Sequence, residues 1–465
     1  LTAAYFLAVE GHEVTVYDAM PHNGGMLRYG IPEYRLPKDI LDKEIDLIAR
    51  MGVKFINSVR VGTDVSLDYL RDNYDAIFLG IGAWKSSGMR VNGEDIPGVM
   101  GGIDFLREVS VNGTVELGDR VAVVGGGNTA MDAVRTAIRL GASEVMCLYR
   151  RTRGEMPAAD IEVEEAEEEG AIFKFLVAPE EIIAENGKVS AIRLQKMALG
   201  EPDASGRRRP VPTGEEEILP VDTVIAAIGQ EVVPGALASV GVNKWNNILA
   251  DDISLMTGIP GVFAGGDCVT GPGIAIAAIA QGKTAARAMN VYLAGQEVTA
   301  AHGYLAERTD LTAESFAEVA KDHRRPFPVL EPAVRRDNFR QVTLSMSIED
   351  ARAEGHRCLE CGCQDYFECK LIDYANQYRV VPDRVAGAQH EEVYRELHPF
   401  IHRDSGKCIL CGLCVRICEE VMGVTALGLV DRGFDSLVQP EMKSPLLETG
   451  CVSCGQCIAV CPTGA

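Results

Sequence analysis

Twelve of the chain's 14 cysteines lie after residue 350, and eight of the twelve form two runs of the same pattern. In each run, three cysteines are separated by two residues, and the fourth follows after an interval of three. Ferredoxins that hold two cubane clusters use this pattern, because each run gives three thiolates to one cluster and its fourth thiolate to the other. Tetrahedral zinc sites rarely repeat such a pattern twice. The spacing therefore predicts two [4Fe-4S] clusters, one held by Cys408, Cys411, Cys414 and Cys461 and the other by Cys418, Cys451, Cys454 and Cys457.

Another group of four cysteines lies just before these runs, with intervals of two, one and five residues. Four thiolates so close together are typical of metal ligands, but this spacing does not decide which metal they bind. It favours a third [4Fe-4S] cluster, and a zinc site or structural thiols are the alternatives. His356 and His390 lie nearby, and we expect them at the surface rather than among the ligands. The candidate ligands are Cys358, Cys361, Cys363 and Cys369.

A glycine-rich turn, VVGGGNTAMD, follows the apolar run Val121–Val124 and precedes a helical pattern. Gly125 and Gly127 let the backbone turn sharply and approach a pyrophosphate, and Ala130 lets the helix pack closely on the strand. A plain structural corner is the alternative. Because a strand precedes the turn and a helix follows it, the motif predicts a dinucleotide site.

The residues after the next predicted strand select the nucleotide. That strand ends at Tyr149, where an NAD site would place an acidic residue for the ribose hydroxyls. This chain has Arg150 and Arg151 there, and guanidinium groups bind phosphate oxygens in bidentate fashion. A solvated basic turn is the alternative. The sequence favours NADP(H), whose ribose carries a 2′-phosphate.

Further α/β elements surround this site. Residues 1–9 have apolar positions at helical spacing, and Val14–Tyr17 is a β-branched run. Together they predict the second half of a βαβ unit whose glycine turn would come before Leu1, so we expect the sequence to begin inside a longer chain. Strands are also predicted within residues 75–87, 221–231 and 258–288, the last followed by a Gly-Gly-Asp turn and a helix.

Six motifs, taken together, resemble a known family over roughly residues 1–300. The family comprises the flavoprotein small subunit of bacterial glutamate synthase and its relatives, including the large subunit of the NADH-dependent ferredoxin:NADP transhydrogenase. The motifs are GGMLRYGIPEYRLPK (24–38), AIFLGIGAWKSS (76–87), VVGGGNTAMDAVRTA (123–137), YRRTRGEMPA (149–158), AAIGQ (226–230) and AGGDCVTGP (264–272).

This resemblance implies that the chain binds FAD and NADPH. By the resemblance, Asp18 would bind the adenosine ribose of FAD, and Asp267 would bind its ribityl and pyrophosphate region. The residues that would line the isoalloxazine are Gly24, Gly25, Met26 and Leu27, and Gly82 and Gly266 also belong to the implied FAD site. The residues that would hold NADPH are Gly125, Gly127, Asn128, Thr129, Ala130, Arg150 and Arg151.

The cysteine-rich end shows a second resemblance. Residues 400–465 are similar to the accessory ferredoxin domain of the complex I large subunit, iron-only hydrogenases and formate dehydrogenases. In those proteins more chain follows, so we expect the chain to extend beyond Ala465. The resemblance implies a subunit or module of a larger redox complex, with other redox subunits or a ferredoxin as partners in a hetero-oligomer.

These observations predict an α/β protein with two Rossmann-like nucleotide-binding domains, the NADP(H) domain being inserted in the FAD domain. The FAD domain would comprise residues 1–115 and 218–297, and the NADP(H) domain residues 116–217. The second part of the FAD domain would be followed by a linker or clamp (298–350), a four-cysteine cluster module (351–385) and an α+β ferredoxin domain with two clusters (395–465). We expect the acidic run EVEEAEEEG (162–170) to form a solvated helix face.

Composition excludes several classes of function. The 45 basic and 67 acidic residues give a net charge of −22, which disfavours binding to nucleic acid. No apolar run approaches the roughly 20 residues of a membrane span. Clustered, metal-binding cysteines are typical of a reducing compartment, so we expect a cytoplasmic protein. The α/β part has only Cys147 and Cys268, far apart in sequence, so the paired-cysteine chemistry of disulfide reductases is not expected.

The predicted function is an iron-sulfur flavoprotein oxidoreductase that takes a hydride from NADPH onto FAD and passes electrons singly to [4Fe-4S] clusters. The reverse direction is equally compatible with these residues, and the terminal acceptor and any electron bifurcation stay open. The alternative is a cluster-relay or scaffold subunit of a hydrogenase or formate dehydrogenase complex, without NADPH turnover of its own.

Overall fold

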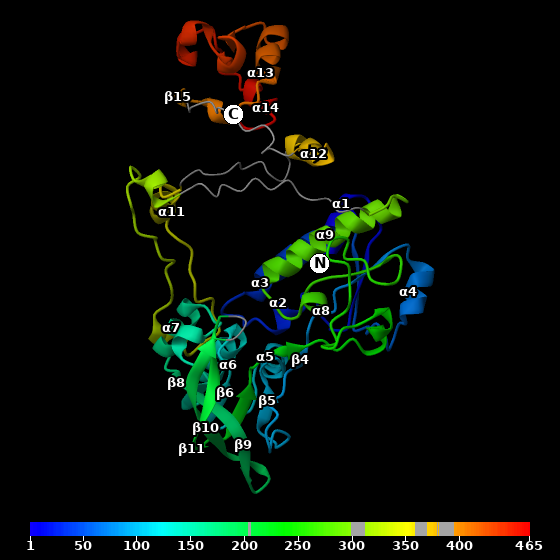
Figure 1. Ribbon diagram of the computed structural model, residues 1–465, viewed down its shortest axis with the longest axis vertical. Coiled ribbons are helices and arrows are strands. Elements are labelled where there is room, and N and C mark those ends of the chain that lie inside the picture. Colours follow the sequence, from blue (N-terminus) through cyan, green and yellow to red (C-terminus); the bar gives the residue numbers. More distant parts are fainter. Residues whose placement is uncertain (203–205, 299–311, 359–369, 379, 381–394) are drawn as a thin grey trace. The chain divides into compact units, whose positions relative to one another are not determined.

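The computed structural model describes residues 1–202, 206–298, 312–358, 370–378, 380 and 395–465 (Figure 1). The chain divides into two compact units. The first comprises residues 1–300 and 325–351, and the second comprises residues 301–324 and 352–465.

A five-stranded parallel sheet carries the glycine-rich turn in the first unit. Its strand order is β5 (Val99–Gly101), β12 (Thr223–Ala226), β6 (Arg120–Val124), β7 (Glu144–Tyr149) and β8 (Ile172–Phe175). The helices α5 (Gly102–Asn112), α6 (Asn128–Arg139) and α7 (Asp160–Glu168) belong to the same domain. The predicted strands and the helix between them are therefore confirmed, and two strands of the sheet, β5 and β12, come from outside residues 116–217.

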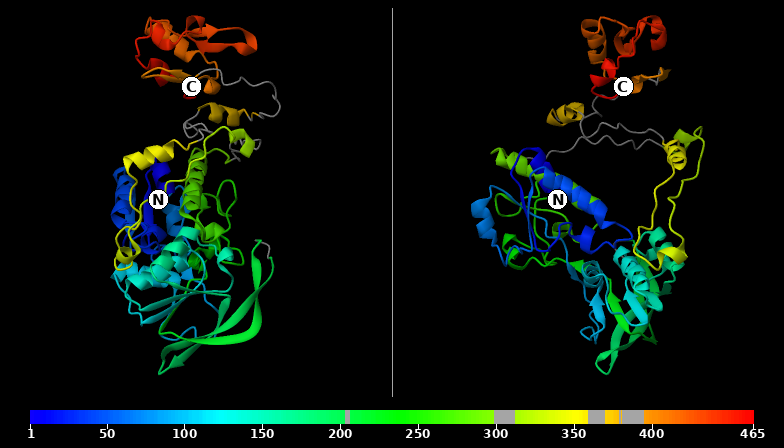
Figure 2. Two further views of the ribbon diagram at one scale, coloured as in Figure 1. Left: turned by 90° about the vertical axis from the view of Figure 1, so that its left-hand side faces the viewer. Right: turned by 180° about the vertical axis from the view of Figure 1, so that it is seen from behind.

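Different layers cover the two faces of this sheet. On one face, the apolar side of α6 packs on Val121, Val123 and Ile225. On the other face lies a three-stranded antiparallel sheet, β11 (Arg208–Pro220), β10 (Lys188–Pro202) and β9 (Val177–Glu185), whose long strands are seen in Figure 2. Asn186 and Gly187, both with positive φ, form the two-residue turn between β9 and β10, the conformation that Asn-Gly favours in a hairpin.

The predicted FAD domain is built from short strand pairs and a long helix. Its parallel pairs are β1 (Thr15–Asp18) with β2 (Lys54–Asn57), and β3 (Ile77–Leu79) with β14 (Val262–Ala264); β4 (Lys85–Ser86) pairs antiparallel with β13 (Gln230–Glu231). Its helices are α1 (Thr2–Val9), α2 (Met26–Tyr29), α3 (Lys38–Arg50), α4 (Leu67–Asn73), α8 (Asp267–Thr270) and α9 (Ala275–Leu293). Helix α1 lies along α9 (Figure 1), and Gly282 allows this close approach because a Cβ there would lie 2.9 Å from Cβ of Thr2.

The segment expected as a linker or clamp packs, over residues 325–351, into the first unit. It contains α10 (Pro332–Arg335), and α11 (Ile348–Gly355) begins in it. The expectation that EVEEAEEEG forms a solvated helix face is wrong for part of the run, because Glu165 and Glu169 are buried. Both form ion pairs with the buried Arg135, and Glu169 also forms one with Arg335 of this segment.

The second unit contains α12 (Lys370–Gln377) and the ferredoxin domain. The ferredoxin domain has two antiparallel strand pairs, β15 (Arg395–Leu397) with β16 (His402–Asp404) and β17 (Gly428–Val430) with β18 (Leu437–Gln439). Its short helices are α13 (Leu413–Arg416), the π-helical turn η6 (Ile417–Val421) and α14 (Gln456–Ala459). A small core of Ile401, Ala426, Leu427, Val438 and Leu446 packs against several of the cysteines.

Candidate redox site

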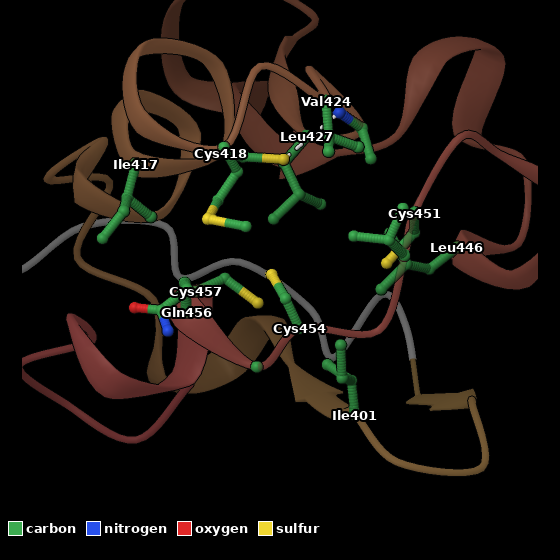
Figure 3. A pocket seen from close by; sticks show the side chains of 14 residues that line it. Ile401, Ile417, Cys418, Val424, Leu427, Leu446, Cys451, Cys454, Gln456 and Cys457 are labelled. Atoms are coloured by element: carbon green, nitrogen blue, oxygen red, sulfur yellow. Dashed lines mark hydrogen bonds between the residues drawn. The ribbon is translucent and has the colours of Figure 1, made fainter.

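Four cysteines from both runs line one hollow in the ferredoxin domain. They are Cys418, from the first run, and Cys451, Cys454 and Cys457, from the second run. Figure 3 shows their side chains around this space, with Ile401, Val424, Leu427 and Leu446 among the apolar walls. The structure thus brings together the four cysteines that the spacing assigned to one cluster.

A second hollow has the complementary set. It is lined by Cys408, Cys411 and Cys414 of the first run and by Cys461 of the second. Cys457 also reaches its wall, as do Ile409 and Ile458. The first run therefore contributes three cysteines to one hollow and one to the other, and the second run does the reverse, with Cys457 lining both hollows. A two-cluster ferredoxin exchanges its fourth ligands in this way.

The loops of the two runs have matching backbone conformations. Leu410 and Ser453, each two residues after the first cysteine of its run, have φ of 58° and 57°. Gly412 and Gly455 have φ of 73° and 72°. The backbone N–H groups of Leu410 and Ser453 donate to the sulfurs of the first cysteines, both at 3.4 Å. N–H groups aimed at sulfur stabilise thiolates, so the loops fit anionic cluster ligands.

The donor set also fits a metal cluster electrostatically. Burial, and next the neighbouring cysteines, raise the pKa of Cys414 and of Cys457 above the usual thiol range. Thiolates gathered so closely therefore need a cationic partner. In the described part of the chain, no three His, Cys, Asp or Glu side chains are arranged around a point where a single metal ion could bind. Each hollow is lined by the four cysteines that a cubane cluster would need.

The glycine-rich turn joins β6 to α6, and two of its three glycines leave no room for a side chain. Gly125 has φ of 148°, and a Cβ there would lie 2.2 Å from the carbonyl oxygen of Ala227. A Cβ on Gly126 would lie 2.5 Å from the ring of Tyr149, whereas a Cβ on Gly127 would make an ordinary contact, 3.9 Å from Cγ of Pro157. Ala130 is fully buried against the sheet. This bare backbone at the start of a helix is a cradle that suits a pyrophosphate.

The loop YRRTRGEMPA closes over the same turn. The N–H of Ala158 donates to the carbonyl of Gly126 at 3.1 Å, and Asn128 Oδ1 accepts the N–H of Ala159 at 3.3 Å. The side chain of Asn128 thus fixes the loop that flanks the turn, and Thr129 is the next residue of the helix.

The two arginines predicted for the 2′-phosphate lie in different environments. Arg150 is exposed beyond the end of β7. Arg151 is 5% exposed, and its Nε donates to the carbonyl of Arg208 in β11 at 2.7 Å. Arg153, two residues later, forms an ion pair with Glu167 at 2.6 Å. Of the predicted pair, Arg150 is the one whose guanidinium faces solvent at the end of the strand.

One predicted FAD carboxylate ends a strand, and the other begins the short helix that follows a strand. Asp18 ends β1, and its Oδ1 accepts the N–H of Met20 at 2.9 Å. Asp267 follows β14 and Gly266, and its Oδ1 accepts the N–H of Gly273 at 3.1 Å. Burial raises the pKa of both carboxyls above the usual range.

Glycines with positive φ accompany these carboxylates. Gly24 and Gly25, with φ of 123° and 55°, lead into Met26 and Leu27 at the start of α2. Gly82 and Gly266 have φ of 70° and 77°. All four predicted glycine positions therefore use backbone conformations that a side chain would strain.

Lys38 is a site residue that the sequence interpretation missed. Its Nζ donates to the backbone carbonyls of Leu27, Ile31 and Leu36, at 3.1, 2.7 and 2.9 Å. Burial lowers the pKa of Lys38 to about 8. The lysine therefore holds together the loop predicted to line the flavin. Lys38 is the last residue of the motif GGMLRYGIPEYRLPK, so this motif was the sequence feature that could have identified it.

The two cysteines of the α/β part are far apart in the sequence, and both are buried. Cys147 is buried in β7, and its sulfur lies 3.3 Å from the carbonyl oxygen of Gly125. Cys268 is buried in α8. Burial raises the pKa of Cys147 to about 12 and also raises that of Cys268. Both are therefore unreactive packed thiols.

The third cysteine group falls mostly outside the described residues. Cys358 is described and exposed, as is His356. The other members, Cys361, Cys363 and Cys369, and also His390, lie outside the described residues. None of the helices in the described part of the chain is long and apolar enough to cross a membrane.

Comparisons with known proteins agree with this geometry. Residues 1–282 match the pyridine nucleotide-disulphide oxidoreductase family, and residues 407–465 match the 4Fe-4S dicluster domain. The chain is 44% identical over 375 residues to the NADP(+)-dependent formate dehydrogenase subunit beta of Moorella thermoacetica, covering 78% of this chain and 53% of that protein. It is 39% identical over 309 residues to the small chain of the NADPH glutamate synthase of Escherichia coli, covering 62% and 65%.

Among solved structures, FprA of Mycobacterium tuberculosis in complex with NADPH has the same fold. Its TM-score is 0.55 at 21% identity, covering 63% of this chain and 83% of that one. The chain thus spans between about half and two thirds of the length of the two curated relatives named above.

Proposed function

Because this chain belongs to the pyridine nucleotide-disulphide oxidoreductase family and has a 4Fe-4S dicluster domain at residues 407–465, we propose that it passes electrons between NADPH and [4Fe-4S] clusters through FAD. FAD, when bound, exchanges a hydride with the nicotinamide and exchanges electrons singly with the clusters. The single observation that carries the proposal is the sorting of the eight cysteines into two hollows, downstream of a complete dinucleotide turn. A chain with these parts needs no further acid or base for the hydride step.

The glycine-rich turn supports the NADPH role. Gly125 to Gly127 expose backbone at the start of α6, where the pyrophosphate of the nucleotide would bind. Arg150 would pair with the 2′-phosphate, since its guanidinium is exposed at the end of β7. Arg151 would hold the backbone next to Arg150 in place, because its Nε donates a hydrogen bond to β11.

The FAD role is supported by the residues at the ends of β1 and β14. Asp18 would accept hydrogen bonds from the adenosine ribose, and Asp267 would lie at the ribityl and pyrophosphate region. Lys38 would keep the segment from Gly24 to Leu27 in place beside the ring, through its bonds to three carbonyls.

The two hollows support two clusters, and we propose a third at the Cys358 group. In the ferredoxin domain, apolar side chains such as Leu427 and Leu446 line the first hollow beside its cysteines. Cys411 and Cys454 are exposed, so each hollow has a ligand near the surface across which a partner could exchange electrons.

We further propose that the chain works as a subunit or module of a larger redox complex. The relatives named above are called a beta subunit and a small chain, and this chain covers only part of each of them. The partner would be another redox subunit or a ferredoxin. All described cysteines are unpaired, which supports a reducing, cytoplasmic location.

The test is spectroscopic. The protein is purified anaerobically with FAD bound, its iron is counted, and absorption and EPR spectra are recorded before and after NADPH. We expect flavin bleaching, followed by signals of reduced clusters, and about twelve irons per chain for three cubanes or about eight for two. A bound flavin that NADPH leaves oxidised would refute the hydride role and favour a cluster-relay subunit.

A further inference from the structure

A segment far along the chain forms a strap on the nucleotide domains. The strap, residues 325–344, folds back on itself: the N–H of Leu330 donates to the carbonyl of Val342 at 3.0 Å, and that of Leu344 donates to Pro328 at 2.8 Å. The short helix α10 lies between these two arms. In Figures 1 and 2 this olive segment runs beside α7.

Arg335 at the end of α10 anchors the strap in the NADP(H) domain. Its side chain is fully buried, and its Nε donates to Glu169 at 2.9 Å. Its Nη2 donates to Glu168 at 2.6 Å and to the carbonyl of Glu165 at 3.3 Å. Its Nη1 donates to the carbonyl of Leu330 in the strap itself, at 3.2 Å. A fully buried cation with this many partners fixes the strap in one position, because any shift would leave charges unpaired.

Glu169 connects the strap to α6. This fully buried carboxylate also accepts hydrogen bonds from Arg135 and Arg139, both on α6. The Nε of Arg139 donates in turn to the carbonyl of Asn338 in the strap, at 3.0 Å. The helix that begins at the nucleotide turn is therefore bound to the strap both through Glu169 and directly.

The same network reaches the loop that follows the predicted flavin segment. Tyr34 is fully buried, with the guanidinium of Arg139 3.9 Å from its ring centroid, and its carbonyl accepts the N–H of Val342 at 2.9 Å. Arg35 donates to both oxygens of Asp132 on α6, at 2.9 and 3.0 Å. The loop, α6 and the strap thus share one connected set of buried and partly buried contacts.

These contacts matter for hydride transfer, because the nicotinamide and the flavin ring must come within about 3–3.5 Å in the correct orientation. The nicotinamide nucleotide would bind where α6 begins, and the flavin would bind beside the segment that leads into Tyr34. We propose that Arg335 is a positioning residue for hydride transfer: through Glu169 and the strap, it holds the NADP(H) domain in the orientation that brings the two rings together. This inference rests on the proposed function.

The test compares Arg335→Gln with Arg336→Gln in the full FAD-loaded protein. Arg336 is the matched control, because it is the next residue and its side chain is 47% exposed. Three quantities are measured: the rate of flavin bleaching at saturating NADPH, the Kd of NADP⁺, and hydrogen exchange in residues 29–37 and 328–344. We expect Arg335→Gln to slow bleaching about tenfold or more, since a misplacement of about 1 Å can cost that much.

The other two measurements separate positioning from binding and from general stability. We expect the Kd of NADP⁺ to change less than about threefold, since the turn itself is intact. Exchange should rise in both peptides for Arg335→Gln and stay unchanged for Arg336→Gln. If Arg335→Gln does not fold, Arg335→Lys, which keeps the charge but forms fewer hydrogen bonds, is judged by the same three criteria.

Two results would overturn the inference while leaving the proposed function intact. One is an unchanged bleaching rate in the Arg335 variant. The other is a slower rate explained wholly by a weaker Kd for NADP⁺. If the flavin of the unaltered protein is not bleached by NADPH, the proposed function itself fails, and a positioning role for hydride transfer fails with it.

Discussion

Glu169→Gln should destabilise the first unit far more than Glu167→Gln, although both residues belong to the same acidic run. Glu169 is fully buried and accepts hydrogen bonds from three buried arginines. Glu167 is 39% exposed and has an ion pair with Arg153, which is also partly exposed. The two substitutions are chemically identical, so their difference reports the environment.

The expected magnitudes follow from burial. Removing one partner from a buried ionic network costs about 3–5 kcal/mol, because the remaining charges stay buried without compensation. Breaking an exposed ion pair costs about 0–1 kcal/mol, because water replaces the lost partner. The free energy of unfolding should therefore fall several times more for Glu169→Gln than for Glu167→Gln.

The pH dependence has a defined sign. Burial alone would raise the pKa of Glu169, but the hydrogen bonds from Arg139 and Arg135 outweigh it and hold the pKa below its ordinary value of 4.5. A carboxyl whose pKa is lower in the folded than in the unfolded protein stabilises the fold while it is ionised. Its contribution is complete above the unfolded-state pKa and is lost as the pH falls through the folded-state pKa. The difference between the unaltered protein and Glu169→Gln should therefore shrink in acid.

The assay is urea unfolding followed by tryptophan fluorescence. Both tryptophans of the chain, Trp84 and Trp245, lie in the first unit, so the signal reports that unit alone. Cluster absorbance at the same urea concentrations serves as a reference for the ferredoxin domain. Equal losses of stability in the two variants, or a loss below about 1 kcal/mol for Glu169→Gln, would refute the idea that the buried network stabilises this unit.

Four further outcomes can be measured. Cys418→Ser should remove about four irons per chain and one cluster's EPR signal while the other remains. Arg150→Gln should reduce the preference for NADPH over NADH, measured as the ratio of kcat/KM values, about tenfold or more, because a charge-assisted bond to the 2′-phosphate is lost. Gly125→Ala should weaken NADP⁺ binding in calorimetry, since its Cβ would lie 2.2 Å from the carbonyl oxygen of Ala227 and force the turn open. The lowered pKa of Lys38, about 8 against 10.5 in the unfolded chain, should make stability rise between these pH values, and Lys38→Met should flatten that rise in urea titrations.

Several features of this protein were predictable because they are encoded over short distances in the sequence. The intervals between Cys408 and Cys418, and between Cys451 and Cys461, limit how their loops can turn, so both hollows followed from the spacing. The glycine turn at Gly125 was equally visible, because strand, turn and helix are consecutive in the sequence.

Other features depend on partners that are distant in the sequence. Arg151 was predicted as a phosphate ligand, and only the structure shows that it is buried and that the carbonyl of Arg208 in β11 accepts its hydrogen bond. Strands β5 and β12 join the NADP(H) sheet from outside the range that the motifs defined, since short apolar strands of this kind look alike in the sequence.

The sequence by itself determined the α/β nucleotide-binding fold and the family, because their motifs depend on local spacing. The cysteine spacing predicted the two sets of side chains that line the hollows, and their role as cluster ligands stays a prediction. Only the tertiary structure decided what the acidic run and the strap do. In the sequence, Glu169 looks like one more charge on a solvated helix. It is buried because Arg335, 166 residues later, folds back to it together with Arg135 and Arg139. A charge pattern predicts the helix but not the residues that pack against it. Whether a carboxylate is solvated or buried therefore depends on distant parts of the chain.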